Sequence, residues 1–324
     1  MSMISAAFRL VGLAMLGVAM TAFGFNGKVA AQSVSPPPSQ MKKVADDLYF
    51  WFDFAGTNSI VWATNEGVLV IDTQPHPAQA RTLIAEIRKI TDKPIKWAFN
   101  TQVHGDHFLG NSTFKKEGAT IIANAHAAYL MERYCEKDVA RRRPGFEKAG
   151  LDPKEATLVL PDKTFEDELV ITMGGRQVRL FYPGPGQDPG ASYAHFPHAK
   201  AVATSGTLTP KSVSNLMYTP SIDGWIKVLR QLQAMDVDTY LPGHGDLGKK
   251  SDIEDTINFL TTLQQEVRAA RAKNTPLAEA QKTITLDAYK SWRNYGRMTD
   301  YVRNVYVLEE TGKPEYWING WERK

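Results

Sequence analysis

Residues 95–107, IKWAFNTQVHGDH, join a short apolar run to a loop that carries two histidines and an aspartate. The apolar run predicts a buried β-strand that ends where the loop begins. In the loop, His104, Asp106 and His107 stand two and one positions apart, so their side chains share one short bend. Gly105 lets that bend tighten, because glycine has no Cβ atom to clash. Imidazole nitrogen and carboxylate oxygen are ligands that zinc takes in catalytic sites, so the stretch predicts a metal site.

A further histidine follows another short apolar run much later in the chain. The segment 240–245, YLPGHG, places His244 between two glycines at the end of a predicted strand. A backbone without flanking Cβ atoms can approach a metal ion closely. His244 is therefore a candidate to join His104, Asp106 and His107 at one site.

Strand-like runs and helical stretches alternate along the chain in two successive rounds. Strands are expected at 48–52, 59–63, 68–71, 95–99 and 120–123, and then at 169–172, 178–182, 193–196, 201–204 and 239–241; helices are expected at 77–90, 125–139, 223–235 and 252–271. Strands followed by helices, repeated once, predict an α/β fold of two sheets packed face to face with helices outside, a four-layer αββα sandwich. The polar segment 141–153 is expected to be a surface insertion, and its basic run a solvent-exposed face.

The pieces of this pattern resemble the metallo-β-lactamase superfamily. The matching segments are VLVIDT at 68–73, the loop segment 100–111, PGPGQ at 183–187 and LPGHG at 241–245, in the family's order and near its usual separations. The resemblance implies the αββα metallo-β-lactamase sandwich, with its site along one edge of the two sheets. It covers roughly residues 48–247.

The metal motif departs from the family's His-x-His-x-Asp-His pattern. Gln102 stands where the first histidine belongs, and Gln187 stands where the family has the histidine of a Gly-His-Thr segment. Thr207 occupies the place of an aspartate that bridges two metals in many relatives. The first metal position therefore retains only His104, together with two amides. Asp188, beside Gln187, either substitutes as a carboxylate ligand or caps its own turn.

The second metal position is complete in this chain. The resemblance assigns Asp106, His107 and His244 to it, a set of three protein ligands with an open place for water. Because an amide oxygen is a weaker zinc donor than imidazole, we expect one zinc ion there, with the ion at Gln102 and Gln187 weakly bound or absent. Zinc activates water and polarises a carbonyl, and the catalytic residue Asp106 would both ligate the ion and orient the water.

The function expected on these grounds is slow hydrolysis of a lactam, lactone, ester or thioester in a small-molecule substrate. Replacement of three metal-site residues leaves open a second class, a periplasmic binding or accessory protein that keeps the fold without efficient catalysis. A redox or sulfur-handling relative is a third possibility, but it requires iron or an electron-accepting domain. A shared fold does not by itself decide among these classes.

The other histidines and the single cysteine are expected to be structural. His126 is expected to lie at the surface or cap a helix, and His195 and His198 to flank a turn that holds no ligand. His76 could line the mouth of the site. Asp72 is expected to support a ligand rather than to be one. Cys135 lies within a predicted helix and is expected to be buried and inert.

The first 31 residues have the pattern of an export signal, with Arg9 before an apolar stretch and small residues before the predicted cleavage site after Ala31. An uncleaved anchor helix is the alternative. Residues 32–45 are expected to be a linker, 46–250 the metallo-β-lactamase domain, and 251–324 a helical extension packed on it. We therefore expect a periplasmic or secreted protein that is not attached to the membrane once the signal is cleaved.

Charge and composition exclude several other classes. The 324 residues are 43% apolar and 23% charged, as in an ordinary globular protein. The formal charge is +3, and loss of Arg9 and Lys28 with the leader leaves +1. A nearly neutral protein has no electrostatic reason to bind nucleic acid. One cysteine excludes an internal disulfide and a cysteine-rich zinc site.

Overall fold

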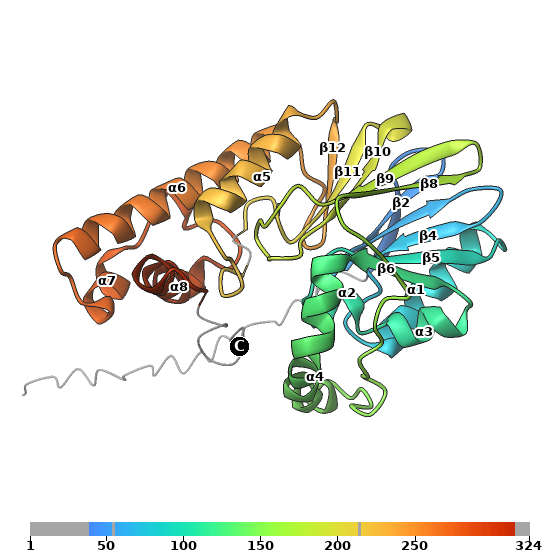
Figure 1. Ribbon diagram of the computed structural model, residues 1–324, viewed down its shortest axis with the longest axis horizontal. Coiled ribbons are helices and arrows are strands. Elements are labelled where there is room, and N and C mark those ends of the chain that lie inside the picture. Colours follow the sequence, from blue (N-terminus) through green and yellow to red (C-terminus); the bar gives the residue numbers. More distant parts are fainter. Residues whose placement is uncertain (1–38, 54–55, 213–214, 315–324) are drawn as a thin grey trace, which may run out of the picture. The chain divides into compact units, whose positions relative to one another are not determined.

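The computed structural model describes residues 39–53, 56–212 and 215–314 (Figure 1). The expected export signal and the first part of the linker lie outside the described residues, as do Trp317 and Trp321 of the expected helical extension. In the described part of the chain, no helix combines the length and the apolar character that crossing a membrane requires.

The first sheet contains seven strands that lie in chain order. They are β1 (Gln40–Lys43), β2 (Leu48–Phe52), β3 (Ser59–Ala63), β4 (Val68–Ile71), β5 (Ile95–Asn100), β6 (Thr120–Asn124) and β7 (Lys163–Phe165). Strands β1 to β4 pair antiparallel, and β4 to β7 pair parallel. Every residue of β4 is buried, as expected for a strand that is covered on both faces.

Residues 40–43 correct the expectation that the whole of 32–45 is a linker. They form β1, in which Gln40 lies opposite Phe52 at the edge of the sheet. The sequence QMKK has no strand-like alternation of apolar residues, so the pairing with β2 decides its conformation.

The second sheet contains five strands in the order β12-β11-β10-β9-β8. They are β8 (Glu168–Met173), β9 (Arg176–Phe181), β10 (Tyr193–Phe196), β11 (Ala201–Ser205) and β12 (Thr239–Pro242). The β11–β12 pair is parallel, and the other neighbouring pairs are antiparallel.

Helices occupy the outer faces of both sheets. They are α1 (Pro77–Ile90), α2 (Gly105–Phe108), α3 (Asn111–Lys116), α4 (Ala125–Lys148), α5 (Ile222–Ala234), α6 (Lys250–Ala272), α7 (Leu277–Thr283) and α8 (Met298–Thr311), with short 3-10 turns η1 (Pro197–Ala199), η2 (Asp287–Tyr289) and η3 (Tyr295–Arg297). Figure 1 shows α1 and α3 beside the first sheet and α5 and α6 beside the second.

Three of the four buried apolar clusters in the described residues show how the layers are held together. Between the two sheets, side chains such as Trp62, Leu180 and Phe196 form one buried cluster. Leu83 of α1 belongs to a second cluster on the outer face of the first sheet. Trp225 of α5 belongs to a third on the outer face of the second sheet, together with α6 and α8. Each sheet therefore has two apolar faces, which confirms the expected four-layer αββα sandwich.

Helix α4 is longer than the sequence predicts. It continues to Lys148 through Pro144, whereas we expected a helix ending near residue 139 and a surface insertion at 141–153. Two contacts account for the added turns. Phe146 packs near His76, with ring centroids 4.8 Å apart, and Arg142 pairs with Asp138 one turn earlier. These contacts outweigh the backbone hydrogen bond that a proline within a helix removes.

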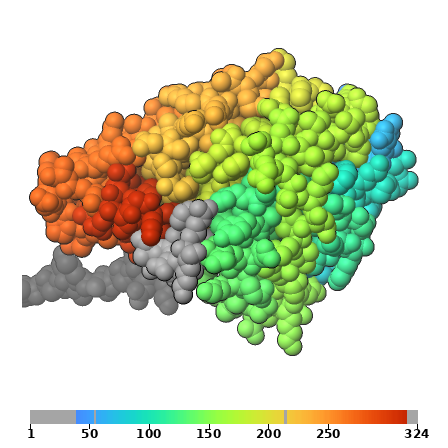
Figure 2. All heavy atoms as spheres, in the orientation of Figure 1, coloured from blue at the N-terminus to red at the C-terminus, as the bar shows by residue number. Residues whose placement is uncertain are grey.

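In the described residues, α6 and α8 share a buried apolar cluster with strands of the second sheet. Phe259 of α6 stacks on Trp292, with centroids 5.5 Å apart, and Tyr289 meets Trp292 edge-on at 4.8 Å. Tyr301 of α8 is buried in the same cluster. Figure 2 shows α5 in yellow-orange and α6 in orange forming one continuous surface.

Candidate metal centre

Hydrogen bonds from the first sheet position the loop that follows β12. The backbone N–H of Asn58 donates to the carbonyl of Gly243 at 2.8 Å. The Asn58 side-chain amide donates to the carbonyls of Pro242 at 3.0 Å and Gly245 at 2.8 Å. These bonds join two segments that lie more than 180 residues apart. They bring His244 to the edge of the first sheet, where β5 ends.

Asp106, His107 and His244 meet at this edge. The Oδ2 atom of Asp106 lies 3.3 Å from Nε2 of His107 and 3.2 Å from Nε2 of His244. Zinc bound tetrahedrally at about 2.0 Å separates neighbouring ligand atoms by about 3.3 Å. Both distances from Asp106 to an imidazole nitrogen therefore match an edge of a zinc tetrahedron. His104 joins the group from the other side, with ligand atoms of His104, Asp106 and His107 all within 4.8 Å of one another.

The outer nitrogens of both metal-facing rings are held by hydrogen bonds. Nδ1 of His107 lies 2.7 Å from Oδ2 of Asp72, and Nδ1 of His244 lies 3.1 Å from the carbonyl of Gly56. A proton on each Nδ1 leaves the Nε2 lone pair to bind a cation. Nε2 of His107 is buried and has no hydrogen-bond partner in the protein. A buried polar atom without a partner is costly, and a bound metal would satisfy it.

Gly243 makes room for the His107 ring. A Cβ atom at this position would lie 2.7 Å from Cε1 of His107, closer than real side chains approach. Gly243 thus lets the backbone beside His244 approach the ring of His107, a candidate ligand.

Asp106 is ionised by its surroundings. Burial opposes the charge, but His107, His244 and the Arg142 guanidinium together hold the pKa of Asp106 well below its usual range. Nη2 of Arg142 lies 3.1 Å from Oδ1, and the Thr57 hydroxyl donates to Oδ2 at 3.0 Å.

Arg142 was expected on a solvent-exposed face, and this expectation was wrong. The side chain is about one quarter exposed and bonds both Asp106 and Asp138. Gly105 permits this arrangement, because a Cβ there would lie 2.8 Å from Nε of Arg142. The four-residue spacing from Asp138 to Arg142 within one helix was the available sequence signal.

The first metal position has a different set of donors. Nε2 of His104 lies 3.2 Å from Oδ2 of Asp188, and both residues are buried. Oδ1 of Asp188 accepts a hydrogen bond from the Gly190 N–H at 2.7 Å. Asp188 therefore caps its own turn with one oxygen and presents the other to His104. Asp188 can therefore cap its own turn and offer a carboxylate oxygen to a metal in the same conformation, so the two alternatives that the sequence left open are compatible.

The two glutamines face this position as well. The side-chain N–H of Gln187 donates to the carbonyl of Asn215 at 2.7 Å, which turns its Oε1 inward. Oε1 of Gln187, both amide atoms of Gln102, Nε2 of His104 and Oδ2 of Asp188 are all buried without a hydrogen-bond partner in the protein. Such a concentration of unsatisfied atoms indicates that water or a cation completes the position.

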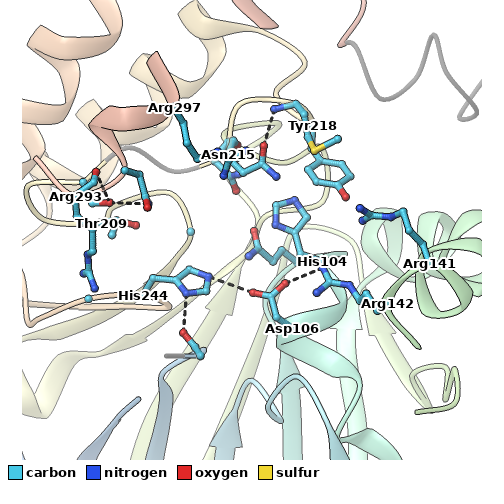
Figure 3. Close-up of a pocket in the computed structure, with 18 residues that line it drawn as sticks. His104, Asp106, Arg141, Arg142, Thr209, Asn215, Tyr218, His244, Arg293 and Arg297 are labelled. Carbon is cyan, nitrogen blue, oxygen red and sulfur yellow. Dashed lines mark hydrogen bonds and ion pairs between the residues drawn. The ribbon is translucent and has the colours of Figure 1, made fainter. Parts of the chain in front are cut away.

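The centre opens into a cavity of about 510 Å³. Figure 3 shows Asp106 and His244 facing each other in it, with Arg293 on one side and Arg142 on the other. It is lined by residues from the loops after β2, β5, β9, β11 and β12, from α2 and α4, and from the helical extension: Gly56, Gln102, His104, Asp106, Arg141, Arg142, Gln187, Gly206, Thr209, Ser212, Asn215, Met217, Tyr218, His244, Gly245, Arg293, Asn294 and Arg297. The ring of Tyr218 packs against His104 at 4.2 Å, a contact that the sequence did not predict.

Other residues considered from the sequence lie outside the cavity lining. His76 is buried, and its Nδ1 caps α1 by accepting from the Ala78 N–H at 3.1 Å. His198 pairs with Asp47 at 3.0 Å.

Two further residues have structural contacts. The Thr207 hydroxyl bonds the Tyr193 hydroxyl at 2.8 Å. Cys135 is buried within α4, and burial raises the pKa of its thiol, as expected for an inert cysteine.

Comparison with known proteins identifies the family. The sequence signature of the metallo-beta-lactamase superfamily matches residues 52–244, more than half of the chain. A linear primary-alkylsulfatase from Pseudomonas sp. (strain ATCC 19151) is 28% identical over 212 residues, which are 56% of this chain and 40% of the sulfatase. The chain thus spans about two fifths of the length of that relative.

Two metallo-beta-lactamases match over most of their length. The type 2 enzyme of Elizabethkingia meningoseptica is 22% identical over 77% of this chain and 95% of its own. The solved structure of a metallo-beta-lactamase from Pontibacter korlensis superimposes with a TM-score of 0.57 at 18% identity, covering 69% of this chain and 99% of that one. The signature, the four layers and the order of the segments agree, and the chain belongs to the metallo-beta-lactamase superfamily.

Proposed function

We propose that the chain is an exported, zinc-dependent hydrolase that acts on a lactam, lactone, ester or thioester in a small-molecule substrate. The observation that carries this proposal is the position of Oδ2 of Asp106, which lies one edge of a zinc tetrahedron from Nε2 of His107 and from Nε2 of His244. The cavity beside them has the size of a small-molecule site. Hydrolases among the relatives, such as the alkylsulfatase and the lactamases, support the same class.

The protein's own groups define how such a centre would work. Zinc, when bound, would lower the pKa of a water molecule and polarise the bond to be cut. Asp106 stays ionised and offers Oδ2 to this position while Arg142 holds Oδ1. His107 and His244 present their Nε2 atoms, because Asp72 and the Gly56 carbonyl hold the opposite nitrogens. The side chains are thus oriented before a substrate arrives.

The retained ligand set favours an enzyme over a binding protein that keeps only the fold. A protein without catalysis has no need to preserve three ligands, their supporting hydrogen bonds and an ionised aspartate together. Loss of two histidines at the first position instead predicts a slow enzyme, because part of the positive charge that would stabilise the reaction's oxyanion is missing.

Metal analysis and a hydrolysis panel test the proposal. Purified protein should contain about one zinc per chain, and His244→Ala should lose it. His126→Ala is the matched control, because His126 lies at the start of α4 and does not line the cavity. Nitrocefin, an aryl ester and a lactone should be assayed with and without a chelator. Absence of zinc in the parent protein, or retention of zinc in His244→Ala, would refute the metal assignment.

Export has its own test. We expect the mature chain to begin at Gln32 and to appear in the periplasmic or secreted fraction of the cell. Mass spectrometry of the N-terminus gives the cleavage position directly. A full-length chain in the membrane fraction would support the anchor-helix alternative.

A further inference from the structure

The cavity beside the metal centre is lined by an excess of positive charge. Arg141, Arg142, Arg293 and Arg297 all face it, and among the described residues that line it Asp106 is the single carboxylate. Figure 3 shows the four arginines on different sides of the same space. Cations gathered in one cavity repel one another, and a divalent metal would add to that repulsion. Such a site favours an anionic occupant.

Three of these arginines pair with the protein's own carboxylates, and Arg297 does so with Asp300. Arg141 and Arg142 both bond Asp138, and Arg142 also bonds Asp106. Their charges are therefore balanced within α4 and at the metal ligand.

Arg293 and Arg297 belong to a different part of the chain. Arg293 precedes η3 and Arg297 is its last residue, so both lie in the helical extension, outside residues 52–244 that match the family signature. Both are exposed, so an incoming molecule can reach them. Arg297 lies near Asp300, with Nε 3.4 Å from Oδ2, and its guanidinium stands 5.9 Å from the Tyr301 ring centroid.

The backbone places Arg293 next to the metal centre. Gly245 directly follows His244, and a Cβ atom added to it would overlap Nη2 of Arg293. The φ angle of Gly245 is +83°, a conformation that also favours glycine. The guanidinium of Arg293 thus occupies the space above Gly245, which the side chain of any other residue at position 245 would fill.

Backbone and side-chain bonds fix this segment to the loop after β11. The N–H of Arg293 donates to the carbonyl of Lys211 at 2.9 Å, and the Ser212 hydroxyl donates to the carbonyl of Arg293 at 3.2 Å. The Asn294 amide donates to the Ser212 hydroxyl at 3.1 Å. These bonds hold the backbone from which the Arg293 side chain extends into the cavity.

We propose that Arg293 and Arg297 form an anion-binding subsite, and that the substrate therefore carries an oxyanion, a carboxylate or a sulfate, near the bond that is cut. The planar guanidinium suits such groups because it donates two parallel hydrogen bonds to paired oxygens. This inference rests on the proposed function, in that the cavity is the substrate site. The segment outside the family signature would then select the substrate of this chain.

Anion titrations of the full chain test the subsite without requiring turnover. Succinate and inorganic sulfate are titrated calorimetrically, with succinamide as the neutral match for succinate. The parent protein should bind at least one of the anions and should not bind succinamide, and the stronger anion identifies the preferred group. Arg293→Gln and Arg297→Gln should weaken anion binding by about 10- to 100-fold, the effect of losing a charged hydrogen bond. Arg293→Lys keeps the positive charge but loses the two parallel N–H donors of the guanidinium. Its anion affinity should lie between those of the parent and Arg293→Gln.

Two controls separate the subsite from the metal and from the proposed function. Arg179→Gln on β9 removes an exposed arginine that pairs with Glu168, and it should bind anions like the parent. Chelated protein should still bind the anion, whether or not the purified chain carries zinc. Equal affinities in the parent and both glutamine variants would overturn the proposal. Anion binding that disappears with the chelator would also overturn it, because the anion would then sit on the metal.

Discussion

Oδ2 of Asp72 lies 2.7 Å from Nδ1 of His107, although neither group is exposed to water. Asp72 reaches this place from a left-handed backbone conformation with φ of 60° at the end of β4. Its other oxygen accepts from the Thr101 N–H at 2.9 Å. A strained backbone position is thus used to hold the carboxylate that orients a candidate metal ligand.

Replacing Asp72 should weaken zinc binding while leaving all three candidate ligands in place. In Asp72→Asn one oxygen becomes an amide nitrogen, so His107 and Thr101 can no longer both donate to the side chain. We expect zinc affinity to fall by about 10- to 100-fold. Competition with a chromophoric chelator measures the affinity. Asp162→Asn, far from the site in the loop before β7, is the control, and equal affinities in Asp72→Asn and the parent protein would contradict the role of Asp72.

The His104–Asp188 pair predicts a second, weaker metal equivalent. Their facing atoms lie 3.2 Å apart, and the two glutamine amides supply neutral oxygens. Titration of the metal-free protein should show a first tight zinc and a second that binds at least about tenfold more weakly, because amides replace two imidazoles. Asp188→Asn should lose the second zinc and keep the first. His244→Ala should lose the first, tight zinc and keep the second. A second equivalent that persists in Asp188→Asn would show that Asp188 is not a ligand.

Two glycines should respond to alanine with opposite signs. At Gly110 a Cβ atom would overlap the carbonyl oxygen of Thr73, because the Gly110 N–H bonds the neighbouring Gln74 carbonyl at 3.0 Å. Gly110→Ala should lower the free energy of unfolding by about 3 kcal/mol. Gly145 is exposed within α4 and has no atom within 4 Å of an added Cβ. Gly145→Ala should raise the free energy of unfolding by about 0.5–1 kcal/mol. Denaturant unfolding of both variants and the parent protein measures the two changes.

Acid should remove the stabilising effect of Asp47. Burial opposes its ionisation, but hydrogen bonds from Trp62 at 3.0 Å and His198 at 3.0 Å, with Arg176 at 2.9 Å, lower the pKa of Asp47. A lowered folded-state pKa stabilises the fold above the unfolded-state value, about 3.9, and this stability is lost as the pH falls through the folded-state value. Asp47→Asn should be about 1–2 kcal/mol less stable than the parent at pH 7. The difference in stability should shrink as the pH falls below the unfolded-state value, and a difference that is constant with pH would contradict the role of Asp47.

Local sequence predicted most of the strands and helices. The segments 48–52, 59–63 and 68–71 were expected as strands and are β2, β3 and β4. Helix α1 begins at Pro77 and ends at Ile90, as expected. Short apolar runs between turn residues carry this information, because the same residues that favour a strand also bury one.

The extension of α4 and the strand β1 could not be predicted in this way. Pro144 argues locally against a helix, and the polar residues 40–43 argue locally against a strand. Partners elsewhere in the fold decide both, since Phe146 packs near His76 and β1 pairs with β2.

The candidate site, too, has residues that the sequence predicts and contacts that only the structure shows. Residue types and spacing within one loop identify His104, Asp106 and His107, and a glycine-flanked loop identifies His244. Only the tertiary structure shows Arg142 on Asp106 and Arg293 beside Gly245. The physical reason is that a motif records which donor atoms a short stretch can offer, whereas the charge around those atoms depends on which distant helices pack over them.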